Sequence, residues 1–177
     1  TNPAAEIIRE AHNYGALVLL DGAQTVPHRE VDVRALDVDF LAFSLHKMCG
    51  PKGVGVLYGK KELLQPEQSG ERGDGIEPVI LGGGTVVDTD YNSYGLLDSP
   101  QRFEAGVQNY PGQIGAAAAV HYLLDLGMNN IQAYEKDLNT FLTGQLLERY
   151  GDTGWFRILG PQEPSERGGI LTFEVKR

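Results

Sequence analysis

Two side chains capable of chemistry lie at the ends of two predicted strands. Asp21 follows the unbroken apolar run 16–20, and Lys47 lies just beyond the apolar segment 40–44. Such short apolar runs are typical of strands buried on both faces, as in a parallel sheet. The carboxyl ends of neighbouring parallel strands meet on one edge of a sheet, where open α/β folds bind ligands. We therefore expect Asp21 and Lys47 to lie on one rim, where a single aromatic cofactor can touch both.

The residue types on this rim fit an aldehyde cofactor that carries a phosphate. Lysine is the usual residue for a Schiff base, because desolvation readily lowers the pKa of a lysine amine. Ser44 and His46, beside Lys47, can donate hydrogen bonds to phosphate oxygens. We expect the Asp21 carboxylate to be desolvated, which is costly unless a positive charge such as a protonated pyridine nitrogen compensates it. An aspartate here can equally cap the next turn, and a lone lysine is usually a solvated surface charge. The prediction of a cofactor site therefore depends on Asp21 and Lys47 occurring together.

The elements that position these residues alternate between helix and strand, which favours an α/β architecture. We predict helices over 3–14, 113–126 and 131–150, and strands over 16–20, 40–44 and 53–59. Asn2 is an acceptable N-cap for the first helix, and Asn129 or Asn130 for the last. The composition of residues 65–78 predicts an exposed loop, and residues 82–84 form a glycine turn.

We predict three regions along the chain. Residues 1–130 form part of a large domain, 131–150 a connecting helix, and 151–177 the start of a small α+β domain that opens with a hairpin at 156–159 and 170–175. The chain begins without methionine and ends in a predicted strand, so we expect it to be a segment of a longer protein.

Composition excludes several classes of function. The formal net charge of −9 disfavours binding to nucleic acid, because the surface repels phosphates. No apolar run is long enough to cross a bilayer, and no signal peptide is visible, which predicts a cytoplasmic location. The single cysteine, Cys49, excludes an internal disulfide. His28 and His121 are interpreted as structural or surface residues, because neither has further ligands at a spacing that suits a metal site.

Several motifs together resemble the class V aminotransferase fold, and within it the cysteine desulfurases of the SufS and CsdA type. The resemblance rests on segments 20–24 (Leu-Asp-Gly-Ala-Gln), 31–33, 39–40, 44–47 (Ser-Leu-His-Lys), 50–58, 82–84 and 102–106 (Arg-Phe-Glu-Ala-Gly). It extends from the start of the chain to about Tyr150. It implies the aspartate-aminotransferase-like fold of enzymes that use pyridoxal 5'-phosphate, in which this chain contributes part of the large domain's parallel-rich sheet with its flanking helices.

The resemblance also implies roles for individual residues. Asp21 would pair with the pyridine nitrogen of the cofactor, and Gln24 with its phenolic oxygen. Ser44 and His46 would hold the phosphate, and Lys47 would form the Schiff base and later transfer a proton. The segment at Gly106 and Val107 would reach the phosphate bound by the partner subunit of a homodimer. The implied reaction removes sulfur from L-cysteine, gives alanine and an enzyme persulfide, and serves a sulfur-acceptor protein in iron–sulfur cluster assembly.

Two departures from the family pattern bear on activity. Val107 stands where the family usually has a threonine whose hydroxyl touches the phosphate, so we expect weaker cofactor retention. The family's nucleophilic cysteine, its arginine for the substrate carboxylate and its ring-stacking histidine belong to segments outside these residues. Cys49 is interpreted as a small packing residue. The chain alone is therefore not expected to complete the reaction.

The sequence is also compatible with other functions. Selenocysteine lyases, kynureninase-like enzymes and small-amino-acid aminotransferases share the same lysine and aspartate, and fold-level likeness does not separate them. A catalytically inactive subunit that keeps the cofactor fold is the non-enzymatic alternative, and Val107 gives it some support.

Overall fold

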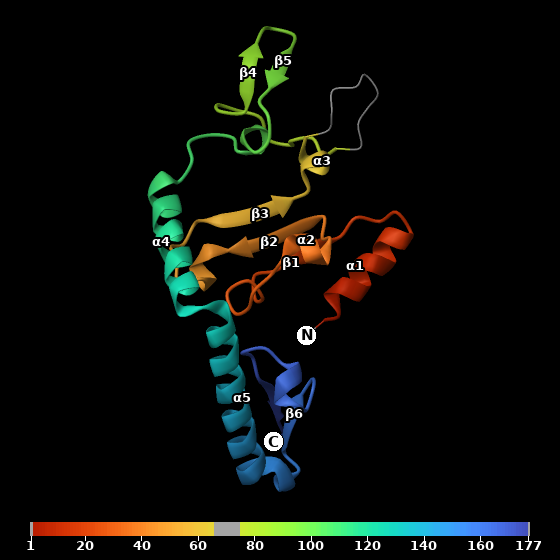
Figure 1. Ribbon diagram of the computed structural model, residues 1–177, viewed down its shortest axis with the longest axis vertical. Helices are drawn as coiled ribbons and strands as arrows, with labels where there is room; N and C mark the ends of the chain where they lie inside the picture. The colour runs from red at the N-terminus through yellow and green to blue at the C-terminus, as the bar shows by residue number, and fades with distance from the viewer. Residues whose placement is uncertain (1, 66–74, 177) are drawn as a thin grey trace.

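A three-stranded sheet forms the centre of the protein (Figure 1). The computed structural model describes residues 2–65 and 75–176, and the predicted loop at 65–78 lies mostly outside the described residues. The strands β1 (Leu19–Asp21), β2 (Phe40–Ser44) and β3 (Gly55–Gly59) follow one another in space. β1 is parallel to β2, and β3 is antiparallel to β2. The predicted α/β class is confirmed, and the described part of the sheet is mixed.

One face of this sheet packs against the first two helices, α1 (Ala4–Asn13) and α2 (Val33–Leu36). Ile8 of α1 is 1% exposed and joins Val38 and Leu41 in a hydrophobic core. α1 begins after Pro3 without a side-chain cap, so the prediction that Asn2 caps this helix is wrong. α2 begins at its cap Asp32, whose carboxylate accepts hydrogen bonds from two backbone N–H groups of the first turn.

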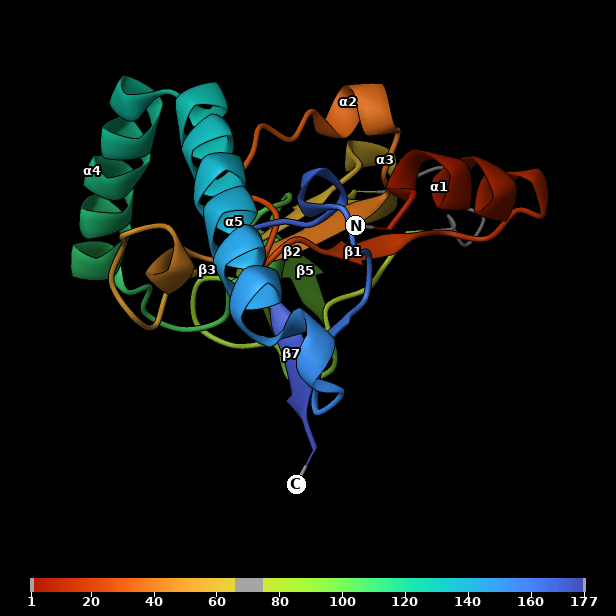
Figure 2. The ribbon, with the colours of Figure 1, turned by 90° about the horizontal axis from the view of Figure 1, so that it is seen from below.

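The other face of the sheet is largely open among the described residues, although Phe40 on that face is only 6% exposed. Leu20 lies in register with Leu41 and faces the core, whereas Leu19 and Leu57 occupy the alternate positions and are 61% and 57% exposed. Side chains of a strand alternate between faces, so the exposure of Leu19 and Leu57 marks a face that is mostly uncovered. Figure 2 shows α1, α2 and α5 on the same side of the sheet. The prediction that β1 is buried on both faces is therefore wrong for this chain.

Two long helices lead away from the sheet. α4 (Tyr110–Leu126) begins three residues earlier than predicted, because Asn109 caps it through a hydrogen bond from the N–H of Gly112. α5 (Met128–Tyr150) follows after Gly127, whose φ of +82° breaks the helix direction. Asn129 and Asn130 lie inside α5, so the prediction that one of them caps it is wrong.

Short elements complete the architecture. They are α3 (Lys61–Leu64), the hairpin β4 (Val86–Thr89) with β5 (Tyr94–Leu96), the hairpin β6 (Phe156–Leu159) with β7 (Thr172–Val175), and the 3-10 turns η1 (Leu45–Lys47), η2 (Gln101–Phe103), η3 (Gly151–Thr153) and η4 (Pro164–Glu166). The predicted hairpin near the C-terminus is confirmed, and it lies beside α5 (Figure 1). Sequence reasoning missed the β4–β5 hairpin. The division into domains stays a prediction.

Candidate active site

The topology brings Asp21 and Lys47 to the same rim of the sheet. Asp21 is the last residue of β1 and lies in register with Ala42 of the parallel strand β2. β2 ends at Ser44, and the turn η1 carries His46 and Lys47 directly beyond it. Because the two strands are parallel neighbours, both residues emerge at their carboxyl ends. The structure thus gathers this part of the predicted site, although the cofactor roles of these residues stay a prediction.

The turn after β2 explains why the lysine faces outward. Leu45 and Met48 are buried at 3% and 7% exposure and anchor the turn in a core with α4. The carbonyl of Leu45 accepts hydrogen bonds from the N–H groups of Met48 and Gly50. A side chain on Gly50 would come within 2.8 Å of that same carbonyl oxygen, so the tight closure needs glycine. With its apolar residues directed inward, the turn leaves Lys47 exposed.

Lys47 also has no ionic partner within residues 2–65 and 75–176. Neither Lys47 nor the exposed His46 makes a hydrogen bond or ion pair through its side chain to this part of the chain. A lysine held in a salt bridge would have to break it before its amine could react. The amine of Lys47 is therefore available for a covalent bond to an aldehyde.

Asp21 differs from the prediction in its surroundings. Its side chain is exposed rather than desolvated, and its Oδ1 accepts a hydrogen bond of 2.9 Å from the N–H of Ala23. Asp21 therefore caps the turn that follows β1, which was the alternative interpretation of this residue. Among the described contacts its second oxygen, Oδ2, accepts no hydrogen bond. Capping therefore fixes the carboxylate and still leaves one oxygen for a ligand.

Gly22 fixes the turn that follows. Its N–H donates to the carbonyl of Ala42 at 2.8 Å, which ties the turn to β2. It is buried, and a Cβ added there would lie 2.7 Å from Cδ1 of Leu41, so the close approach requires glycine. The exposed Gln24 lies two residues further on in the same turn.

The segment with Gly106 and Val107 lies apart from this rim in the contacts described. The N–H of Gly106 donates to the carbonyl of Gly83 at 2.8 Å, and the side chain of Val107 is 93% exposed. The buried Thr85 closes the glycine turn through hydrogen bonds with Gly82. No described contact joins Gly106 or Val107 to Asp21 or Lys47, so their predicted role toward a partner subunit stays untested.

A buried ion cluster at the opposite end of the strands escaped the sequence analysis. Asp39 is 2% exposed and accepts hydrogen bonds from His12, from Lys60 and from the N–H of Val18, at 2.8, 2.9 and 2.7 Å. Burial raises the pKa of Asp39, but the hydrogen bonds from His12, Lys60 and Val18 outweigh it and lower this pKa to about 2. The exposed Asp37 also contacts Lys60, at 2.6 Å. The cluster fastens α1 to the sheet.

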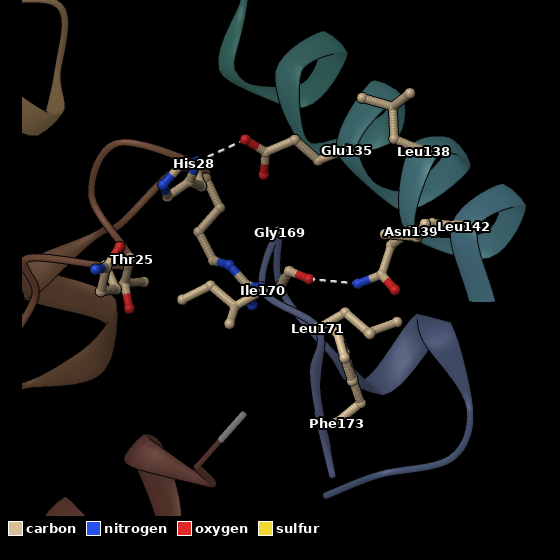
Figure 3. Close-up of a pocket in the computed structure, with 13 residues that line it drawn as sticks. Thr25, His28, Glu135, Leu138, Asn139, Leu142, Gly169, Ile170, Leu171 and Phe173 are labelled. Atoms are coloured by element: carbon tan, nitrogen blue, oxygen red, sulfur yellow. Dashed lines mark hydrogen bonds and ion pairs between the residues drawn. The ribbon is translucent and has the colours of Figure 1, made fainter. Parts of the chain in front are cut away.

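A cavity of about 590 Å³ separates the turn after β1 from the last hairpin and α5 (Figure 3). Residues of three segments line it: Gln24, Thr25, His28 and Arg29 after β1; Glu135, Leu138, Asn139 and Leu142 of α5; and Gly168–Leu171 with Phe173. His28 Nδ1 lies 2.5 Å from Oε1 of Glu135. His28 was predicted to be a structural or surface residue, and its contact with Glu135 is consistent with a structural role.

The fold is that of an α/β protein in which Asp21 and Lys47 lie at the carboxyl ends of parallel strands. Residues 1–177 match the aminotransferase class-V family, and the chain belongs to that family. It is 46% identical over 177 residues to a cysteine desulfurase of Dickeya dadantii, covering 99% of this chain and 39% of the relative. It is 41% identical over 174 residues to a cysteine desulfurase of Haloferax volcanii, covering 98% of this chain and 38% of the relative. The chain thus spans about two fifths of these relatives.

Solved structures agree with this assignment. The cysteine desulfurase CsdA from Escherichia coli superposes with a TM-score of 0.82 at 34% identity, over 98% of this chain and 39% of the other. The cystine C-S lyase C-DES, in complex with its product cysteine persulfide, gives a TM-score of 0.75 at 26% identity, over 98% of this chain and 43% of the other. No helix among the described residues is long and apolar enough to cross a membrane.

Proposed function

We propose that this chain belongs to a pyridoxal-phosphate-dependent cysteine desulfurase, which converts L-cysteine to alanine and passes the sulfur to an enzyme cysteine. One observation carries the proposal: the amine of Lys47, which has no ionic partner among residues 2–65 and 75–176, and the carboxylate of Asp21 share one rim of the sheet. Relatives of 40% to 46% identity that are named cysteine desulfurase or probable cysteine desulfurase support the substrate. The nucleophilic cysteine belongs to residues outside this chain, because Cys49 lies in the turn beside Lys47.

The residues of the rim fit the cofactor. Lys47 has a free, exposed amine for a Schiff base, and Ser44 and His46 flank it as donors to a phosphate. Asp21 has one carboxylate oxygen left to hold a protonated ring nitrogen, and Gln24 can donate to the ring oxygen. When bound, the cofactor withdraws electrons from the bonds at the α-carbon of the substrate.

Each residue then has a defined task. The negative charge of Asp21 keeps the ring nitrogen protonated, because an opposite charge within contact distance favours the charged form. The Nζ of Lys47, once released, accepts the proton from the α-carbon of the substrate and can return it. The hydrogen bond from Ala23 to Asp21 orients the carboxylate, so less side-chain conformational entropy is lost when the cofactor binds.

The decisive experiment locates the cofactor on the chain. Purified protein is mixed with pyridoxal 5'-phosphate, its absorbance is recorded, and the adduct is reduced with borohydride and mapped by mass spectrometry. We expect the absorbance band and the added mass on Lys47, and we expect both to vanish in Lys47→Ala. The matched control is Lys52→Ala, an exposed lysine five residues further along, which should keep the band.

Two outcomes would contradict the proposal. One is a folded wild-type protein without the band, and the other is a band that persists in Lys47→Ala. Product analysis on the full-length protein separates the reactions of the family: alanine with sulfide from L-cysteine supports desulfuration, and a keto acid indicates transamination. A homodimer, a sulfur-acceptor protein and a cytoplasmic location are further parts of this proposal.

A further inference from the structure

We propose that His28 and Glu135 are positioning residues that hold the turn of Asp21 and Gln24 against α5 and the last hairpin. The inference rests on the proposed function, because it assigns these two residues to the geometry of the same cofactor site. It is carried by three sets of contacts: the turns between Gly22 and Arg29, the pairing of His28 with Glu135, and the packing of Glu135 against Gly169.

The segment between Gly22 and Arg29 forms two consecutive hydrogen-bonded turns. The carbonyl of Gly22 accepts from the N–H groups of Thr25 and Val26, at 2.9 Å each. The carbonyl of Thr25 accepts in turn from those of His28 and Arg29, at 3.0 and 3.1 Å. Any displacement of His28 is therefore transmitted through Thr25 to Gly22.

The N-terminal end of this segment is fixed to the sheet and lies next to Asp21. The N–H of Gly22 bonds to β2, and Asp21 directly precedes it in β1. Gln24 lies within the first of the two turns, and its exposed side chain lines the cavity. Its placement thus depends on the anchor at each end of the segment.

The C-terminal end of the segment is anchored to α5 by the hydrogen bond between His28 and Glu135. His28 Nδ1 and Glu135 Oε1 are 2.5 Å apart, and their side chains are 34% and 24% exposed. Figure 3 shows His28 reaching from the loop toward Glu135 on the helix. Such a short contact between partly buried side chains is stronger than an exposed surface pair.

Glu135 also touches the last hairpin segment. A Cβ added to Gly169 would lie 3.3 Å from Oε2 of Glu135, so the carboxylate lies directly against this glycine. One helical turn further along α5, the buried Asn139 donates to the carbonyl of Gly168 at 2.6 Å, a contact drawn in Figure 3. Thr143 accepts a hydrogen bond from Arg167, also at 2.6 Å. Glu135 therefore joins the site turn to a hairpin that α5 already holds.

The test compares four variants with the wild type, namely His28→Ala, His28→Asn, Glu135→Ala and His121→Ala. Asparagine carries its amide nitrogen at the same number of bonds from the backbone as histidine Nδ1, so it can restore the hydrogen bond. His121 is an exposed histidine on α4 and serves as the control. Far-UV circular dichroism confirms that each variant is folded.

The first measurement needs no cofactor and uses hydrogen exchange of the amides between Gly22 and Arg29. We expect exchange about five- to tenfold faster in His28→Ala and Glu135→Ala, since a hydrogen bond of this kind contributes on that scale. His28→Asn should return to the wild-type rate, and His121→Ala should not differ from it. Amide exchange rates in His28→Ala and Glu135→Ala equal to those of the wild type and of His121→Ala would overturn the inference.

The second measurement reads the site through the bound cofactor. In His28→Ala and Glu135→Ala we expect a shifted absorbance maximum and a cofactor dissociation constant raised about fivefold, both rescued by His28→Asn. A purely structural contact would change stability without moving the absorbance maximum. An unshifted maximum with unchanged affinity overturns the inference, whereas a wild type without any band overturns the proposed function instead.

Discussion

Asp39→Asn removes the negative charge at the centre of the buried cluster, and we expect it to destabilise the folded protein. The pKa of Asp39 is lowered from 3.8 to about 2, and one pKa unit is worth about 1.4 kcal/mol. The charge therefore contributes about 2 kcal/mol to the free energy of unfolding near neutral pH. An asparagine adds a cost, because its amide group opposes a donor, so we expect a total loss of about 2 to 4 kcal/mol.

The pH dependence has a definite sign. Because the pKa of Asp39 is lower in the folded than in the unfolded state, its contribution is present above the unfolded value of 3.8 and is lost as the pH falls toward 2. Roughly half of the 2 kcal/mol has disappeared at about pH 3, with almost none lost at about pH 5. The unfolding free energies of wild type and Asp39→Asn should therefore converge as the solution is acidified.

Urea unfolding followed by far-UV circular dichroism measures this convergence between pH 6 and pH 3. Asp37→Asn is the matched control, since Asp37 contacts the same Lys60 but its side chain is 67% exposed. Screening by solvent predicts a clearly smaller loss for that variant. A difference between wild type and Asp39→Asn that stays constant over the whole pH range would refute the reasoning.

Two further predictions concern the approach to α4. Asn109→Ala should lower the free energy of unfolding by about 1 kcal/mol, because the N–H of Gly112 loses its 3.1 Å partner. Urea unfolding measures this loss, and Asn109→Asp, which keeps the acceptor, should restore most of it. Val107→Thr should lower the cofactor dissociation constant, because it adds a hydroxyl to a side chain that is 93% exposed and thus free to reach a partner's phosphate. An affinity equal to that of the wild type in equilibrium dialysis would count against a phosphate contact at this position.

The elements that the sequence predicts well are those with a strong local pattern. The strand 40–44 and the C-terminal hairpin appear at the predicted places, because apolar runs and turn residues specify them locally. The caps were less predictable. Asn109 and Gly127 begin the two long helices, although Asn129 and Asn130 offered equally good capping chemistry. Which candidate caps a helix depends on where the preceding turn ends, and packing decides that.

The two aspartates at opposite ends of the sheet show where local patterns fail. Asp21 follows an apolar run and was expected to be desolvated, yet it is exposed and caps a turn. Asp39 precedes an apolar run in a similar way, yet it is buried. The difference comes from partners far away in sequence. Asp39 accepts hydrogen bonds from His12 and Lys60, whereas among the described residues Asp21 accepts one only from Ala23 in its own turn. A carboxylate can be buried only where donors converge on it. Strand pairing brings such donors together, so the burial of an acidic residue depends on the sheet around it rather than on its neighbours in sequence.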